Sequence, residues 1–224
     1  MMDSTDGQGD SSEQEVILEV ACNVSDTLEE SIALGEEDLL RVALLTLERV
    51  HVGESVEISL LVTDDEGLRE LNRDFRGRDE ATDVLSFPLL DTPLLEAPAD
   101  ELWQAADENA GATLAHTGEQ DGAWPQPDTI EPMDLADDDG DSGDFEDDDG
   151  DFEDDPLHLG DIAISRDAVA RQAAAAGHSI AWECAYLFAH GLLHLMGFDD
   201  STDAGYRAMV AHQEAILTEA HISR

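Results

Sequence analysis

Apolar residues recur along the chain with two spacings, and each spacing predicts one type of regular element. Short runs of apolar and β-branched residues predict strands. These runs occupy residues 16–21, 56–64, 83–88 and 160–165. Longer segments, in which apolar residues return every three or four positions, predict helices. These segments cover residues 36–50, 65–77, 166–176, 180 to about 196, and 203 to about 220.

Residues that suit helix ends flank the predicted helices. Ser165 and Ser179 each precede a helix, where a hydroxyl can accept a hydrogen bond from a free backbone N–H. Ser201 or Thr202 can do the same for the last helix. The expected helix stops are Gly77, Gly177 and Gly197. Strands mixed with helices, without strict alternation, predict an α+β fold with several helices packed on a small mixed sheet, and they leave the strand order open.

Two acidic segments interrupt this pattern. Residues 1–14 are polar, and residues 91–156 contain 24 Asp or Glu and no Arg. Such segments bury too little apolar surface to offset the entropy lost on ordering. We therefore expect a disordered acidic N-terminus at 1–14. We also expect one domain at 15–224, interrupted by an acidic insertion at about 91–156 that is disordered at least from about 105 to 155.

The net charge is the next constraint. The chain has 55 acidic residues against 10 basic ones, all of them arginine, for a formal charge of −45. Such a chain repels nucleic acid in dilute salt. At 1 M salt the Debye length falls to roughly 3 Å, which relaxes that repulsion. We therefore hypothesise a halophilic acidic protein that works at high internal salt.

Other features of the sequence favour a cytoplasmic location. Residues 1–14 lack the basic and apolar regions of a secretory signal. The chain has no run of about 18 apolar residues that could span a membrane. The two cysteines, Cys22 and Cys184, fit no C-x-x-C spacing, which is consistent with a reducing compartment.

The segment HGLLHLMGFDD at 190–200 carries the candidate metal chemistry. His190 and His194 are four residues apart on a predicted helix, so both imidazoles project from one face. Gly197 ends the helix, and the chain can then bring Asp200 or, as the alternative, Asp199 back toward the histidines. Three protein ligands leave a position open for water, which suits a catalytic metal site.

The spacing is close to that of the long zinc-protease motif, with one informative difference. Zinc proteases place a glutamate general base directly after the first histidine, where this chain has Gly191. Glycine cannot accept a proton from water. Proteolysis by the usual route is therefore not expected.

A cluster of arginines gives the acidic chain its one local positive patch. Its members are Arg69, Arg73, Arg76 and Arg78. Guanidinium groups suit phosphate oxygens, although neighbouring carboxylates can pair with them instead. Local pairing is the stronger expectation for Arg69 and Arg73. Phosphate contact is expected most for Arg76, which lies at the end of its predicted helix.

Three segments together resemble the YbeY family of endoribonucleases. They are LNRDFRGRDEATDVLSFP (71–88), LGDIAIS (159–165) and HGLLHLMGFDD (190–200). The resemblance implies an α+β fold with one Zn²⁺ at the mouth of a positively lined cleft. It implies single-strand-specific cleavage of RNA in maturation of the small-subunit rRNA 3′ end and in ribosome quality control, with an rRNA precursor and the small ribosomal subunit as partners. No nucleotide cofactor is expected.

The resemblance also assigns residues. His190 and His194 match the family's zinc ligands, and Arg76 matches a catalytic or phosphate-binding arginine. Arg78 and Ser86 are expected to contact substrate, and Ser86 and Asp161 to line the cleft. The third ligand of the family is usually histidine, so Asp200 is a departure that bears on metal preference. The acidic insertion is a second departure.

Two other functional classes remain open. The first is a ribosome-assembly or RNA-binding factor in which the metal only stabilises the fold, an alternative that the lack of an obvious general base favours. The second, weaker alternative is a metal hydrolase acting on a small substrate. Cleavage assays with and without a chelator distinguish a nuclease from a binding factor.

Overall fold

A computed structural model describes residues 15–22, 27–103 and 155–224. The strands are β1 (Val16–Cys22), β2 (Val56–Thr63), β3 (Val84–Pro88) and β4 (Leu157–Ser165). The helices are α1 (Leu28–Ile32), α2 (Glu36–Arg49), α3 (Asp65–Arg76), α4 (Arg166–Ala176), α5 (Ile180–Met196) and α6 (Asp203–Glu219).

The four strands form one mixed sheet in the order β1-β2-β4-β3. β1, β2 and β4 run parallel, whereas β3 pairs antiparallel with β4 and forms an edge of the sheet. Pro88 ends this edge strand, a position where the missing N–H breaks no central ladder. The predicted α+β fold with a small mixed sheet is confirmed.

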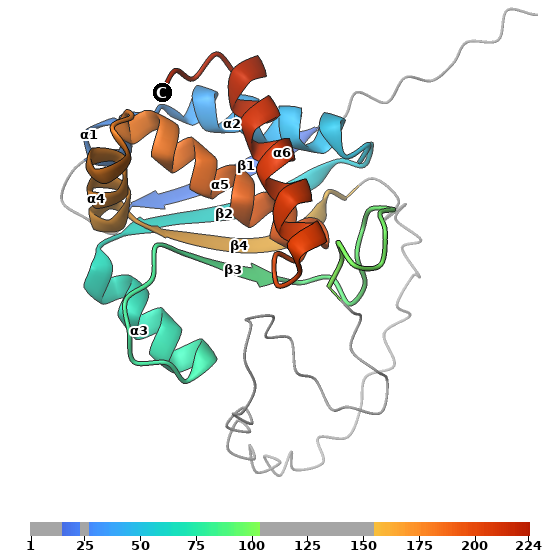
Figure 1. Cartoon of the computed structure of the whole chain (residues 1–224), viewed down its shortest axis with the longest axis horizontal. Helices are drawn as coiled ribbons and strands as arrows, with labels where there is room; N and C mark the ends of the chain where they lie inside the picture. Colours follow the sequence, from blue (N-terminus) through green and yellow to red (C-terminus); the bar gives the residue numbers. More distant parts are fainter. Residues whose placement is uncertain (1–14, 23–26, 104–154) are drawn as a thin grey trace, which may run out of the picture.

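The two faces of the sheet are covered unequally. Helices α2, α5 and α6 lie on one side, and α3 lies on the other (Figure 1). The main core fills the space under the three helices, with Val56, Ile58 and Leu60 of β2 pointing into it. On the other face, α3 packs over a small cluster that includes Leu68 and Leu85. Much of that second face is therefore left for a cleft.

Helix α5 is the central helix of the covered side. Most of its residues are buried, because it contacts β3 and β4 of the sheet as well as helices α2, α4 and α6. Ser179 caps its N-terminus by accepting a hydrogen bond from Trp182 N at 3.1 Å. Gly197 follows its last residue with φ 128°, where a Cβ would come within 2.6 Å of Pro93. The expected glycine stop is confirmed, and the chain reverses there.

A bulge in β4 sets which of its residues face the cleft. Glu57 pairs with His158 and Ile58 pairs with Gly160, so Leu159 is an extra residue. Gly160 has φ 130°, and a Cβ there would lie 2.1 Å from the carbonyl oxygen of Phe87. The bulge lets Leu159 join the main core while Asp161, two residues on, lies on the opposite face.

The predicted helix ends agree with the structure in detail. Ser165 accepts a hydrogen bond from Ala168 N, and Gly77 follows α3 with φ 67°. Thr202, rather than Ser201, caps α6 by accepting from Gly205 N at 2.9 Å. The short helix α1, with its capping box between Thr27 and Glu30, was not predicted. Strand β4 also begins three residues earlier than predicted.

The start of the predicted insertion packs against the end of α5. Leu94 N donates to Met196 O at 2.9 Å, and Trp103 N donates to Gly197 O at 2.9 Å. Leu95 and Trp103 are buried. The predicted disorder at 1–14 and at about 105–155 falls, except for Asp155, outside the described residues. Among the described helices, none combines the length and apolar character that crossing a bilayer requires.

Candidate metal centre and cleft

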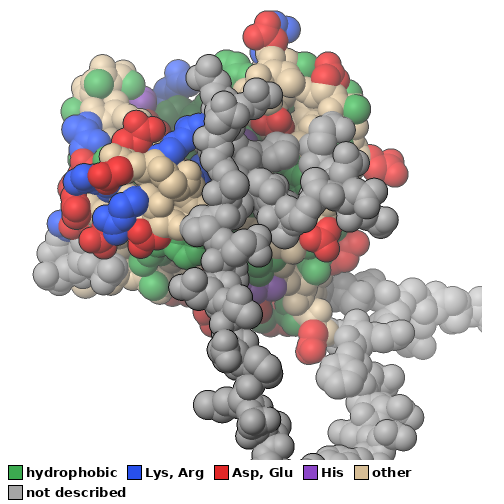
Figure 2. Space-filling model, turned by 90° about the horizontal axis from the view of Figure 1, so that it is seen from below, with side chains coloured by type: hydrophobic (Ala, Val, Ile, Leu, Met, Phe, Trp, Pro, Cys, Tyr) green, Lys and Arg blue, Asp and Glu red, His purple; other side chains and the backbone are tan. Residues whose placement is uncertain are grey.

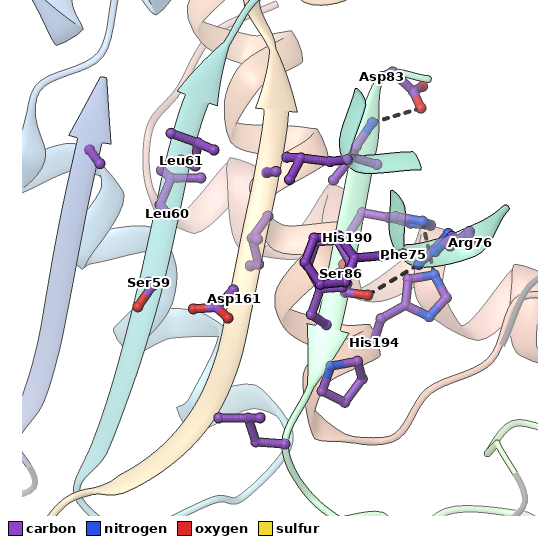
Figure 3. Close-up of a pocket in the computed structure, with 18 of the residues that line it drawn as sticks. Ser59, Leu60, Leu61, Phe75, Arg76, Asp83, Ser86, Asp161, His190 and His194 are labelled. Atoms are coloured by element: carbon purple, nitrogen blue, oxygen red, sulfur yellow. Dashed lines mark hydrogen bonds between the residues drawn. The ribbon is translucent and has the colours of Figure 1, made fainter. Parts of the chain in front are cut away.

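His190 and His194 of α5 point toward each other at the end of the cleft. Their Nε2 atoms lie 3.0 Å apart, and the ring centroids lie 4.5 Å apart with the planes nearly perpendicular. Each side chain is about one-fifth exposed, at 22% and 21%. The one-turn spacing in the helix therefore brings the two nitrogens together, as the sequence predicted (Figure 3).

Asp200 completes the cluster from the loop that follows α5. One carboxylate oxygen lies 3.8 Å from His190 Nε2, and the other lies 3.8 Å from His194 Nε2. Asp199, the alternative third ligand, forms hydrogen bonds with Ser201 instead. Its carboxylate accepts hydrogen bonds from Ser201 N at 2.9 Å and Ser201 Oγ at 2.6 Å. The structure thus brings Asp200, and not Asp199, to the histidines.

The donor set fits a zinc-sized ion. All three ligand atoms lie within 4.8 Å of one another, the one such group among the described residues. Two ligands at the usual Zn–N distance of about 2.05 Å and a tetrahedral angle would lie about 3.3 Å apart. The two Nε2 atoms lie 3.0 Å apart, and each lies 3.8 Å from a different oxygen of the Asp200 carboxylate, so these distances bracket that value. His190, His194 and Asp200 could therefore hold one metal ion without rearrangement of the backbone.

Both imidazoles are kept neutral and available as ligands. Burial, with a smaller effect of His194, lowers the pKa of His190 to about 4, although Asp200 opposes the shift. Burial also lowers the pKa of His194. The Nδ1 atom of His194 lies 2.9 Å from Phe198 O, so Nδ1–H donates there and Nε2 keeps its lone pair for a metal.

Gln213 of α6, which was not predicted from the sequence, supports His190 in a similar way. Its side chain is buried, hydrogen bonds to His190, and donates from Nε2 to Tyr186 O at 3.2 Å. Because the amide N–H₂ faces Tyr186, the amide oxygen is left to accept from the His190 ring. The sole sequence signal is a polar residue within the apolar face of the last helix, which does not identify its partner.

A cleft of about 1150 Å³ leads from the candidate metal ligands across the open face of the sheet. Its walls include Arg76 and Arg78 of the α3 end, Ser86 of β3 and Asp161 of β4. Figure 3 shows Ser59 and Asp161 on neighbouring strands, with Arg76 close to the two histidines. The predicted site residues therefore line one cleft.

The arginines of α3 have different partners. Arg69 forms two hydrogen bonds with the Asp79 carboxylate, at 2.7 and 3.0 Å, and Arg73 bonds to Asp74 at 2.9 Å. Figure 2 shows arginines over α3 interleaved with acidic side chains. Arg76 instead donates to the backbone carbonyl of Ser86 at 3.1 Å. Within the described ranges no carboxylate forms an ion pair with Arg76.

Arg76 is a half-buried cation near the candidate metal ligands. Burial lowers the pKa of Arg76, and the charge of Arg78 lowers it further. The charge of Arg76 in turn helps to lower the pKa of His194. A guanidinium remains protonated at neutral pH. An anion in this part of the cleft would therefore meet a positive charge that no described carboxylate neutralises.

The cleft as a whole differs from the positively lined cleft that the resemblance implied. Its two arginines face four carboxylates. These are Glu19, Asp83, Asp161 and Asp200. Among the described lining residues, positive charge in the cleft comes from Arg76 and Arg78 alone, to which a bound metal ion would add. The difference follows from the acidity of the chain, which extends into the folded domain.

Gly191 lies where a zinc protease would have its glutamate. A Cβ at this position would come within 3.0 Å of Ile162 and 3.1 Å of Ser86 Oγ. The helix can approach β3 and β4 this closely because the residue has no side chain. The close packing of α5 on the sheet therefore leaves little room at this position for the glutamate of a zinc protease.

Comparisons with known proteins agree on one family. The family model described as "Endoribonuclease YbeY" matches residues 25–221. A protein named Endoribonuclease YbeY from Moorella thermoacetica is 36% identical over 192 residues, covering 84% of this chain and 90% of that protein. Its namesake in Geobacillus kaustophilus is 31% identical over 202 residues, covering 89% and 97%. The similarity spans nearly the whole of both relatives.

Proposed function

The chain belongs to the YbeY family of endoribonucleases, and from this we propose that it is a zinc-dependent enzyme that cuts single-stranded RNA. We further propose that it acts in the cytoplasm, on the precursor of the small-subunit rRNA and in ribosome quality control. One observation carries the proposal. A metal-type cluster of His190, His194 and Asp200 and a half-buried arginine, Arg76, line the same cleft.

The residues of the cleft have separate roles in this proposal. A zinc ion held by His190, His194 and Asp200 would act as a Lewis acid and activate water for attack on a phosphodiester. Arg76 binds the non-bridging phosphoryl oxygens and stabilises the negative charge that grows on them during the reaction. Phe198 O and Gln213 keep the two imidazoles in the orientation that a ligand requires.

Arg76 is suited to its role by its own contacts. Its bond to Ser86 O fixes the guanidinium at the cleft wall with one of its five N–H groups. A planar fork held in this way can bind two oxygens of one phosphate. Ser86 and Arg78 line the same wall and are proposed to contact the adjoining nucleotides.

A cleavage assay with metal analysis tests the proposal. Purified protein is analysed for bound metal and given labelled single-stranded and duplex RNA, with and without chelator. We expect about one zinc per chain and chelator-sensitive cutting of the single strand. His190→Ala should lose both the metal and the cutting. Metal-dependent stability with no cutting would instead indicate an assembly factor with a structural metal.

A matched pair of arginine variants tests the phosphate contact. Arg76→Lys keeps the charge but loses the planar fork, so cleavage should fall by roughly 10- to 100-fold with metal content unchanged. Arg73→Lys, on the same helix but paired with Asp74 outside the cleft, is the control and should cleave normally. Equal effects of the two substitutions would remove Arg76 from the proposed site.

A further inference from the structure

The apolar stripe of α3 ends on an exposed aromatic ring at the cleft. Leu68 is fully buried against Leu85, and Leu71 is partly buried. Phe75, one turn further on, is 45% exposed and lines the cleft. Its ring lies edge-on to that of Phe87, with centroids 5.3 Å apart at 62°. The helix thus covers one part of the sheet face and leaves apolar ring surface open beside the other.

This aromatic pair adjoins the proposed phosphate site. Arg76 directly follows Phe75, and its guanidinium carbon lies 6.0 Å from the centroid of the Phe87 ring. An arginine for the backbone beside an aromatic face for a base is the usual arrangement in sites for single-stranded nucleic acid. The pair Phe75–Phe87 therefore lies where the base of a nucleotide held at Arg76 could reach.

The floor of the cleft next to the rings is unsuited to a second phosphate. Glu19, Ser59, Asp161 and Phe87 lie directly opposite one another on adjacent strands and form one row across the sheet. The two carboxylates repel anions but accept hydrogen bonds from amino and hydroxyl groups. A nucleobase or ribose offers such donors and carries no charge. The row therefore favours the uncharged part of a nucleotide.

We propose that Phe75 and Phe87 form a stacking subsite for one unpaired nucleobase of RNA. Ser59 and Asp161 face the donor groups of that base or of its ribose. The inference rests on the proposed function and gives a physical cause for single-strand preference. A base inside a duplex is stacked on both faces and has no surface to offer, whereas an unpaired base does.

Substitutions at Phe75 test the subsite. Phe75→Leu keeps an apolar side chain but removes the ring, so KM for single-stranded RNA should rise about 5- to 100-fold, with a smaller change in kcat. Phe75→Tyr keeps the ring and should restore KM to within about 3-fold of wild type. Tyr206→Leu removes another exposed ring, on α6 and outside the cleft, and should change neither constant.

An abasic scan shows whether the ring contacts a base. RNAs with one abasic nucleotide at successive positions are bound to wild type and to Phe75→Leu in chelator, by fluorescence anisotropy. At one position, removal of the base should lower the RNA affinity of wild type but should not further lower the RNA affinity of Phe75→Leu. Equal losses for both proteins at every position, or a Phe75→Leu variant that binds and cuts like wild type, would overturn the subsite and leave the surface to a protein partner.

The two proposals fail separately in these experiments. If wild-type protein with zinc cuts no RNA, the proposed function is wrong, while the anisotropy comparison in chelator still decides whether Phe75 contacts a base. If wild type cuts single strands and Phe75→Leu cuts them equally well, only the stacking subsite is wrong. Thermal unfolding of each variant checks the fold, which a half-exposed side chain should affect little.

Discussion

The indole Nε1–H of Trp103 donates a hydrogen bond to the backbone carbonyl of His194 at 3.2 Å. The bond joins the start of the predicted acidic insertion to the helix turn that carries His194, a proposed metal ligand. Trp103 is 5% exposed, and its backbone N–H also bonds to Gly197 O. The segment before residue 104 therefore contributes to the wall that holds His194 in place.

Substitution of Trp103 should affect both stability and metal binding. Trp103→Ala removes a large buried side chain and should lower the free energy of unfolding by about 3 kcal/mol. It should also weaken zinc affinity, because His194 loses a neighbour that restrains it. Trp103→Phe removes the indole N–H and part of the ring and should cost about 1 kcal/mol. Urea unfolding in chelator and zinc competition titrations measure the two effects.

Leu95→Ala is the control for Trp103. Leu95 belongs to the same segment and is buried in the main core. Its truncation should lower stability by about 2 kcal/mol and leave zinc affinity unchanged. If Trp103→Ala changed stability by less than about 0.5 kcal/mol, the packing of 91–103 on α5 would be refuted.

Neighbouring aspartates provide a matched test of the third ligand. Asp200→Asn and Asp199→Asn each remove one negative charge two or three residues after Gly197. We expect Asp200→Asn to weaken zinc binding by more than the roughly 10- to 100-fold that loss of a supporting partner causes. Asp199→Asn should cost only about 1 kcal/mol of stability, because its carboxylate bonds to Ser201.

The comparison of the two variants separates ligation from general electrostatics. Zinc affinity is measured for both by competition with a chromophoric chelator at the same pH and salt. If zinc affinity depended on the nearby negative charge alone, the two substitutions would weaken zinc binding equally. Such equality would exclude Asp200 as a ligand.

Local features of the candidate metal centre were predictable from the sequence. The one-turn spacing of His190 and His194 is a property of the helix itself, and Gly197 marks the point where the chain turns back. The choice of Asp200 over Asp199 followed from the family resemblance and not from local geometry. In the structure it depends on the hydrogen bonds that Asp199 forms with Ser201, and both orientations are compatible with the same short sequence.

Features that depend on contacts between distant segments were beyond the sequence. The strand order places β4 between β2 and β3, and the bulge at Gly160 sets Asp161 on the cleft face. Gln213 supports His190 from another helix. Residues 91–103 were grouped with the acidic insertion because its average composition concealed two buried side chains, Leu95 and Trp103. Composition averaged over a long segment cannot reveal a few anchoring residues.

The metal-free protein should lose stability as the pH falls from about 6.5 toward 4. Burial lowers the pKa of His190 to about 4, whereas in the unfolded chain a histidine has a pKa near 6.5. Between these values the unfolded state binds a proton that the folded state does not, so acid favours unfolding. The contribution of His190 is fully present above pH 6.5 and is lost as the pH falls through this window.

His190→Gln isolates this contribution. Burial raises the pKa of Glu183, which gives a stability change of opposite sign with pH, so wild type must be compared with a variant. Urea unfolding in chelator is measured between pH 4.5 and 7.5. As the pH falls, the free energy of unfolding should decrease less steeply for His190→Gln than for wild type. Equal pH dependence in the two proteins would mean that His190 is not kept neutral by burial.

High salt should stabilise the fold, as a consequence of the excess of acidic residues. The segments 15–90 and 157–224 contain 27 acidic residues against 10 arginines. Salt weakens exposed pairs such as Arg69–Asp79, but each such pair contributes only about 0–1 kcal/mol. Salt also screens the repulsion among the unpaired carboxylates, which outnumber the arginines. We therefore expect the free energy of unfolding to rise between 0.1 and 1 M KCl.

A charge variant shows whether this rise has an electrostatic origin. Glu48 and Glu70 are exposed on α2 and α3, outside the cleft. The double variant Glu48→Lys, Glu70→Lys changes the net charge by four units and should gain less from added KCl than wild type. RNA affinity should also be less reduced by salt than for a basic protein, since four carboxylates line the cleft. A wild-type protein that loses stability as KCl is added would contradict the proposed adaptation to salt.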